Sequence, residues 1–244
     1  MTNYLLTISF LGSSLYGSQA QKGLPTAQSV LEKALEKDFH QKIKTHPASR
    51  LDGGVSARGW SVAFKAEGQL DPEKVKYMLN RALVRTMHVE EVKIVSDDFV
   101  PRFQAKKKVY SYLINFGERN PLKDYLAWAP SFKGDKEIFK KTMMLFEGQH
   151  DFSAFMSEED KKKDCTFKEV EKIEILEEGD YLKVMVKGHS FGRYQVRFMV
   201  GAAFYASAGL LKEEEIIKRL NGEEKETIHF KAPPEGLVLE EVIY

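Results

Sequence analysis

The stretch SRLDGGVSARGWSVAFK, residues 49–65, carries a carboxylate just before two glycines, where a turn leads into a strand. An ionised carboxylate at Asp52 could act as a nucleophile toward an electrophilic carbon. Gly53 and Gly54 permit tight backbone geometry beside it. Because Asp–Gly is also among the commonest turn signals, a purely structural turn is the alternative that the residue types leave open.

A second unusual feature is an arginine in the segment FGRYQVRFMVGAAFYASAG, residues 191–209. Apolar residues surround Arg197 on nearly every face of the predicted helix, which is typical of a buried helix. A guanidinium stays charged, so a buried one needs a carboxylate or a ligand phosphate as its partner. Asp52 is a plausible partner that Arg197 would keep ionised. The alternative is that Arg197 extends along its aliphatic stem to solvent.

The elements that must position these residues follow from hydrophobic periodicity and turn signals. In the first part of the chain, these signals predict a strand that closes at Gly12, a helix over residues 26–39 and a strand near residues 42–46. They then predict a strand through Trp60 and Phe64, a helix capped by Asp71, and a strand with Val92 and Ile94. This order is β-α-β-β-α-β, and it places Asp52 in a loop between two strands.

The second part of the chain repeats this order. Here the pattern predicts a strand with Tyr110 and Tyr112, a helix from about Asp135, and strands with Ile173 and Val184 joined through residues 177–180. It then predicts a helix over about 191–211, an amphipathic segment at 212–220, and a last strand near residues 237–244. The repeat is one of pattern only, because the two parts show no similarity in sequence.

We therefore predict an α+β fold with two ferredoxin-like halves, residues 1–104 and 105–244. Their sheets are expected to join side by side with the helices packed on one face, and an active-site cleft is expected between the halves. The first half would carry the aspartate loop, and the second would carry Tyr110 and Arg197. An exposed sheet face with aromatic and basic residues suits RNA.

Composition narrows the class of protein. The 244 residues, 43% hydrophobic and 30% charged, can form a sizeable core. No apolar run approaches the roughly 20 residues of a membrane span, and the start MTNYLLTISF lacks the features of a secretory signal, so we expect no membrane partner and a cytoplasmic location. The single cysteine, Cys165, excludes an intramolecular disulfide and a thiolate zinc cluster, and no metal is expected.

The formal net charge of +1 does not indicate a polyanionic partner, although local patches could still bind phosphate. Lys106–Lys108 and Lys161–Lys163 are basic runs, and further cations surround the aspartate loop. A solvated face is the alternative for each run.

Several motifs together resemble one family. RLDGGVSA resembles the catalytic motif R-T-D-x-G-V-H-A of the tRNA pseudouridine synthase A family. Further segments similar to its motifs are FLGSSLYGSQAQ, TAQSVLEKAL, FVPRFQAKKKVYSYLI, GQHDFSAF and FGRYQVRFMVG. The resemblance covers most of the chain, and it is specific as a set rather than through any single motif.

The resemblance implies an isomerase that converts uridine to pseudouridine in tRNA, at anticodon stem-loop positions 38 to 40, as a homodimer without a cofactor. On this alignment Asp52 is the nucleophile, and Tyr110 and Arg197 are further catalytic residues. The target nucleotide must be flipped out of its stack, and Tyr110 could pack against the flipped base. The residues expected to bind the RNA are Arg50, Arg58, Lys65, Arg102, Lys106, Lys107, Lys108 and Arg193.

The sequence departs from the family's pattern at five positions near these motifs: Leu11 stands in place of aspartate, Leu51 of threonine, Ser56 of histidine, Ser18 of the usual tryptophan, and Gln195 of methionine. These departures predict a narrower or shifted set of target uridines. The alternatives are a paralogue that modifies a different RNA site, a non-catalytic RNA-binding protein on the same fold, and a dimerisation scaffold.

Overall fold

A computed structural model describes residues 1–162 and 165–244, so Lys163, the last lysine of the second basic run, lies outside the described residues. The chain forms two compact units. The first contains Met1–Lys106 together with Val238–Tyr244, and the second contains Lys107–Leu237. The sequence pattern placed residues 237–244 with the second half, whereas residues 238–244 pack with the first unit.

The first unit has the predicted order of elements. These are β1 (Thr2–Phe10), a 3-10 turn η1 (Gly12–Ser14), α1 (Ala27–Phe39), β2 (Thr45–Pro47), β3 (Ser56–Ala66), α2 (Pro72–Ala82), β4 (Met87–Val95) and α3 (Pro101–Gln104), with β9 (Leu237–Ile243) returning at the end of the chain. Strands β4, β1, β3 and β2 pair antiparallel in that order. Strand β9 pairs parallel with the start of β3.

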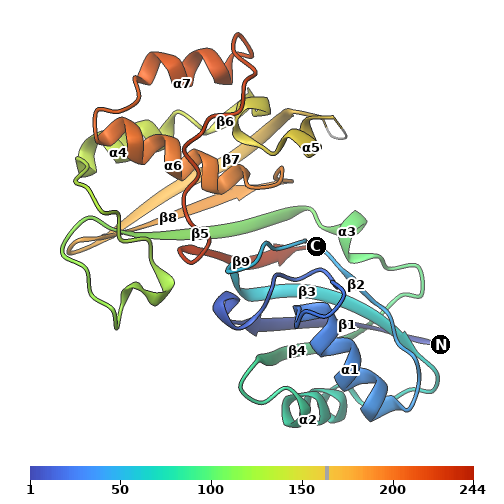
Figure 1. Cartoon of the computed structure of the whole chain (residues 1–244). Helices are drawn as coiled ribbons and strands as arrows, with labels where there is room; N and C mark the ends of the chain where they lie inside the picture. The colour runs from blue at the N-terminus through green and yellow to red at the C-terminus, as the bar shows by residue number, and fades with distance from the viewer. Residues whose placement is uncertain (163–164) are drawn as a thin grey trace. The chain divides into compact units, whose positions relative to one another are not determined.

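Local sequence signals explain these elements. Thr26 caps α1 by accepting a hydrogen bond from the Ser29 N–H at 3.2 Å, and Asp71 caps α2 by accepting from the Glu73 N–H at 2.9 Å. Alternate residues of β1 are buried beneath the helices, and Tyr4 stacks on Phe64 with ring centroids 5.0 Å apart. Helices α1 and α2 lie on the same side of the strands (Figure 1).

The second unit is also α+β, which confirms the predicted fold class. Its elements are β5 (Lys107–Asn115), η2 (Asp124–Leu126), α4 (Lys136–Met144), β6 (Gly148–Asp151), η3 (Ser153–Phe155), α5 (Glu158–Lys161), β7 (Phe167–Glu178), β8 (Tyr181–Gly188), α6 (Gln195–Ser207) and α7 (Glu213–Leu220). Strands β5, β8, β7 and β6 pair antiparallel in that order. The β7–β8 turn falls at the predicted place, with Gly179 at φ +59°.

Some bounds differ from the prediction. Helix α6 is shorter than residues 191–211, because Tyr194 before it has φ +68° and Gly209 after it has φ +73°, and both values interrupt the helical backbone. Strand β2 begins at Thr45 rather than near residue 42. The short polar strand β6 was missed, because GQHD has no apolar alternation and is held by pairing with β7.

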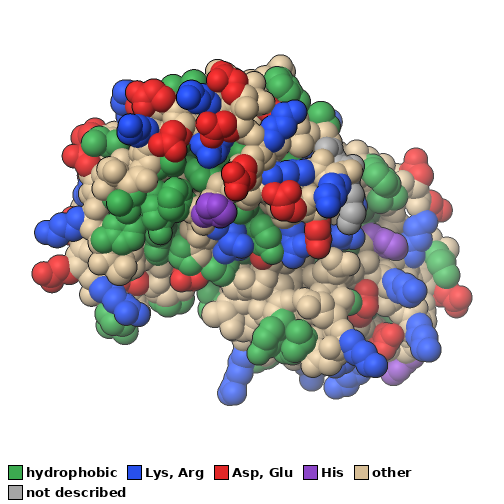
Figure 2. Space-filling view, turned by 45° about the horizontal axis from the view of Figure 1, so that its top comes forward, with side chains coloured by type: hydrophobic (Ala, Val, Ile, Leu, Met, Phe, Trp, Pro, Cys, Tyr) green, Lys and Arg blue, Asp and Glu red, His purple; other side chains and the backbone are tan. Residues whose placement is uncertain are grey.

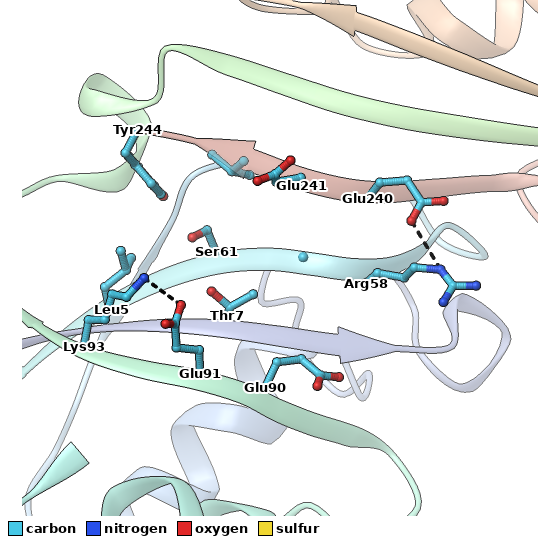
Figure 3. A pocket seen from close by; sticks show the side chains of 12 residues that line it. Leu5, Thr7, Arg58, Ser61, Glu90, Glu91, Lys93, Glu240, Glu241 and Tyr244 are labelled. Atoms are coloured by element: carbon cyan, nitrogen blue, oxygen red, sulfur yellow. Dashed lines mark ion pairs between the residues drawn. The ribbon is translucent and has the colours of Figure 1, made fainter. Parts of the chain in front are cut away.

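The face of the first unit's sheet that points away from α1 and α2 carries a hollow of about 310 Å³ (Figure 3). Its lining includes four carboxylates, from Glu90, Glu91, Glu240 and Glu241, and two cations, from Arg58 and Lys93. Carboxylates repel phosphate, so this part of the sheet does not provide the basic face that the sequence suggested for RNA.

Charge is dispersed elsewhere as well. Figure 2 shows acidic and basic side chains interspersed over the face it presents, as the small net charge implies. Within residues 1–162 and 165–244, no helix is long and apolar enough to cross a membrane. Over the same residues, no group of three or more His, Cys, Asp or Glu side chains is arranged to hold a metal ion.

Candidate active site

The loop that carries Asp52 is fixed by backbone hydrogen bonds to the segment after β1. Leu51 donates its N–H to the Ser18 hydroxyl at 2.7 Å, and its carbonyl accepts from the Ser18 N–H at 2.9 Å. The Asp52 carbonyl accepts from the Val55 N–H at 3.2 Å, and Gly54 supplies φ +85°. Both backbone polar groups of Leu51, the residue before the aspartate, are therefore hydrogen-bonded to Ser18. The Asp52 side chain is half-buried.

A close backbone approach completes this loop. A Cβ atom at Gly12 would overlap the backbone of Gly54 and Val55, so only glycine fits there. The Gly12 N–H donates to the Ser56 hydroxyl at 2.9 Å. The segments FLGSSLYGSQAQ and RLDGGVSA, far apart in sequence, thus form one rigid support for the carboxylate.

Three of the five departures from the family pattern have a common structural role. The side chain of Ser18 accepts from Leu51 N–H, that of Ser56 accepts from Gly12 N–H, and that of Gln195 accepts from Gly192 N–H at 2.8 Å. Each is buried and satisfies a backbone donor. Ser56, which stands in place of the family's histidine, therefore helps to hold the loop through its bond to Gly12.

Replacing Ser18 with Ala should lower the free energy of unfolding by about 1–3 kcal/mol, because the buried Leu51 N–H loses its acceptor. We also expect a slower single-turnover rate, because the loop that carries Asp52 loosens. Urea unfolding and a single-turnover assay measure the two effects. Ser14→Ala is the matched control, since Ser14 is exposed in η1 and its hydroxyl makes no hydrogen bond with the described residues. Equal effects from both variants would contradict this role of Ser18.

Arg197 lies in α6 and is only 7% exposed. Its Nε donates to the Ala232 carbonyl at 2.8 Å, and the Ala232 N–H donates to the Arg197 carbonyl at 3.0 Å. Its guanidinium also lies 5.3 Å from the centre of the Tyr194 ring. The alternative in which Arg197 extends to solvent is therefore wrong.

The Tyr194 ring gathers further cations. Lys231 Nζ lies 4.1 Å from the ring centroid and the Arg193 guanidinium 4.8 Å from it. Cations over an aromatic face are attracted by its quadrupole. Sequence reasoning missed Lys231, because it is 34 positions from Arg197 in a stretch without regular periodicity, and only the folded segment brings it to this ring.

Tyr110 lies on β5, opposite Val186 of β8. It is buried, and its ring makes an edge contact with Phe191 at a centroid distance of 5.3 Å. Its neighbour Tyr112 is fully buried and donates its hydroxyl hydrogen bond to the Pro233 carbonyl at 2.7 Å. Burial raises the pKa of Tyr112 well above its usual value, so this phenol stays a neutral donor.

The eight cations expected to bind RNA are distributed over both units. Arg50, Arg58, Lys65, Arg102 and Lys106 are exposed in the first unit, Lys107 and Lys108 are half-buried at the start of β5, and Arg193 is exposed before α6. Among them, Arg58 pairs with Glu240 at 3.2 Å, Lys107 with Glu171 at 2.8 Å, and Arg193 with Glu159 at 3.1 Å. A phosphate would have to compete with these carboxylates.

Comparison with known proteins identifies the family of the chain. The family model described as tRNA pseudouridine synthase matches residues 143–244. The tRNA pseudouridine synthase A of Aquifex aeolicus is 35% identical over 244 residues, covering 100% of both chains. That of Dictyoglomus turgidum is 37% identical over 248 residues, again covering 100% of both chains.

The chain belongs to the tRNA pseudouridine synthase A family. It is a pseudouridine synthase, an enzyme that isomerises uridine to pseudouridine. A solved structure titled "Crystal Structure of a Cbf5-Nop10-Gar1 Complex" aligns with a TM-score of 0.37 and 16% identity over 82% of this chain and 44% of that chain, a likeness too weak to add to this conclusion. In this tRNA pseudouridine synthase A family member, the full-length match spans both the Asp52 loop and helix α6.

Proposed function

We propose that this enzyme isomerises uridines in the anticodon stem-loop of tRNA, at positions 38 to 40, with Asp52 as the nucleophile. The observation that carries the proposal is the loop itself: a half-buried carboxylate follows Leu51, whose N–H and carbonyl are both fixed by Ser18. This support keeps the carboxylate in a defined position, which nucleophilic attack requires. The relatives named tRNA pseudouridine synthase A support tRNA as the substrate.

The chemistry requires a nucleophile and a flipped base. Pseudouridine formation breaks the bond from N1 to C1′, rotates the uracil, and joins C5 to C1′, while the hydrogen on C5 is lost and N1 gains one. An aspartate can hold the intermediate covalently through C1′ of the ribose or C6 of the base. The rearrangement adds no atom and needs no oxidant, so this proposal includes no cofactor.

The remaining roles follow from residue type and burial. We propose that Tyr110 packs against the flipped base, since its ring is already fixed by Phe191. Arg197 supplies a buried positive charge to the reaction, either to the carboxylate or to the space that the base leaves. The exposed cations bind phosphates and set the register of the RNA without reading its sequence.

Mapping pseudouridine along a full set of unmodified tRNAs, with the purified chain and no added cofactor, tests the proposed site. We expect new pseudouridine within positions 38 to 40, confined to fewer of these positions or tRNAs if Leu11 and Leu51 alter the pocket. Modification confined to another region of tRNA would overturn the proposed site while leaving the pseudouridine synthase activity intact.

Reversing the charges of Lys106, Lys107 and Lys108 to Glu should weaken tRNA binding by about tenfold or more and flatten its dependence on salt, because each phosphate contact releases counterions. The rate of a single turnover at saturating enzyme should change much less. Filter binding at several salt concentrations measures the first effect. The matched control reverses three exposed lysines on helices α1 and α2, Lys33, Lys37 and Lys74. A larger loss in rate than in affinity would place this run in the chemistry instead.

We also propose that the enzyme acts as a homodimer in the cytoplasm, as the family resemblance implies. Light scattering of the purified chain, alone and with tRNA, tests the dimer. A mass of one chain, 27.9 kDa, under all conditions would contradict it.

A further inference from the structure

The segment over residues 230–236, FKAPPEG, which we call the strap, runs between helix α6 and strand β5 inside the second unit. At one end the Phe230 ring stacks on Tyr205 of α6 with centroids 3.9 Å apart. In the middle, Ala232 exchanges two hydrogen bonds with Arg197. At the other end the Gly236 carbonyl accepts from the Leu113 N–H of β5 at 2.9 Å. The strap thus connects the arginine to the strand that carries Tyr110.

Two glycines show how closely the strap packs. A Cβ at Gly201, one turn after Arg197, would overlap the Phe230 carbonyl. A Cβ at Gly236 would lie 2.7 Å from the Leu113 carbonyl and from the ring of Tyr112. The strap therefore has little freedom to move relative to either α6 or β5.

The side chain of Tyr112, on β5, makes a hydrogen bond to the strap. Its hydroxyl donates to the Pro233 carbonyl at 2.7 Å, next to the Ala232 carbonyl that accepts from Arg197. Its ring is fully buried and makes an edge contact with Trp128 at 6.5 Å. The raised pKa, caused first by burial and then by the charge of Glu235, keeps the hydroxyl protonated over the working pH range.

We infer that Tyr112 is a positioning residue for the reaction: by fixing the Pro233 carbonyl it holds the strap, and through the Ala232 carbonyl it sets the direction of the Arg197 guanidinium. This inference rests on the proposed role of Arg197 in the reaction. A guanidinium is effective only when its planar donors point correctly, so loosening one carbonyl that orients it should affect rate more than binding.

Tyr112→Phe removes only the hydroxyl and keeps the buried ring. We expect the single-turnover rate to fall about tenfold, with the tRNA dissociation constant unchanged within about twofold. Tyr4→Phe is the matched control, because Tyr4 is also fully buried and its hydroxyl bonds to the backbone of Leu70, at 2.7 Å from the N–H and 3.1 Å from the carbonyl. It should lose comparable thermal stability but keep its rate within about twofold.

Pro233→Ala provides a second variant, since it keeps the carbonyl that Tyr112 binds but removes the ring that stiffens the strap. It should lower the rate less than Tyr112→Phe does. If Tyr112→Phe is folded, as judged by circular dichroism, and its rate equals that of wild type, the inference is overturned. The same conclusion holds if Tyr4→Phe loses as much rate as Tyr112→Phe.

A double-mutant cycle separates this inference from the role of Arg197 itself. If Tyr112 acts through Arg197, Tyr112→Phe should cost almost no further rate in an Arg197→Lys background. Full additivity would show that Tyr112 acts by another route and would overturn the inference alone. If Arg197→Lys and Arg197→Ala both keep the wild-type rate, the proposed role of Arg197 fails first, and the inference fails with it.

Discussion

Replacing Asp52 with Ala should reduce pseudouridine formation at least about a thousandfold, because the variant lacks the carboxylate that we propose as the nucleophile. Binding of tRNA should stay within about tenfold of wild type, since phosphate contacts dominate affinity. The bonds that Ser18 and Ser56 make to the loop do not involve the Asp52 side chain and remain in the variant, and circular dichroism should check that it folds. Single-turnover conversion and filter binding measure the two quantities.

The choice of substitution matters for this test. Asp52→Asn preserves shape better than Ala, but it creates an Asn–Gly pair with Gly53, and such pairs deamidate and regenerate aspartate. Residual activity of the Asn variant that grows during storage would come from that reaction and not from the amide. Asp97→Asn is a matched control, since Asp97 is an exposed carboxylate of the same unit. An Ala variant that keeps more than a tenth of the wild-type rate would remove Asp52 from the nucleophile role.

Much of the fold could be predicted from sequence because its signals are local. The Asp71 cap and the hydrophobic alternation in β1 each act within a few residues, and the structure confirms them. The helix predicted to open at Thr26 begins at the next residue. The parallel pairing of β9 with β3 could not be predicted, because it joins residues about 180 positions apart and leaves no periodic mark. The sequence predicted this strand but assigned it to the second half, whereas residues 238–244 belong to the first unit.

In the candidate site, too, the sequence indicates some residues and leaves others to be found in the fold. The motif pointed to Asp52 and the lone buried cation pointed to Arg197, because charge in an apolar setting is visible in sequence. The supports of these residues are backbone groups, such as the Ala232 and Pro233 carbonyls, and a backbone group has the same chemistry at every position. The sequence therefore cannot distinguish Tyr112 from an ordinary core aromatic, because the bond from its hydroxyl to the strap depends on the fold.

Replacing Arg197 with Ala should lower the single-turnover rate at least about a hundredfold, because a buried, oriented charge is hard to replace by water. Lys at this position keeps the charge but lacks the planar donor that binds the Ala232 carbonyl, so it should recover only part of the rate. Thermal unfolding of both variants should be measured alongside the rate. The Ala variant also leaves the buried Ala232 carbonyl without its donor from Nε, so part of its lost rate could come from lost stability.

The pH profile of Arg197→Ala decides how the guanidinium acts. If Arg197 favours the ionised form of Asp52, its removal makes the carboxylate easier to protonate, and the ionised fraction then increases with pH. Part of the lost rate should accordingly return as the pH rises, in single-turnover reactions that exclude product release. The Lys variant should show a smaller dependence on pH, because it retains a positive charge. A profile for the Ala variant that runs parallel to wild type, only lower, would mean that Arg197 positions the RNA and leaves the charge of the nucleophile unchanged.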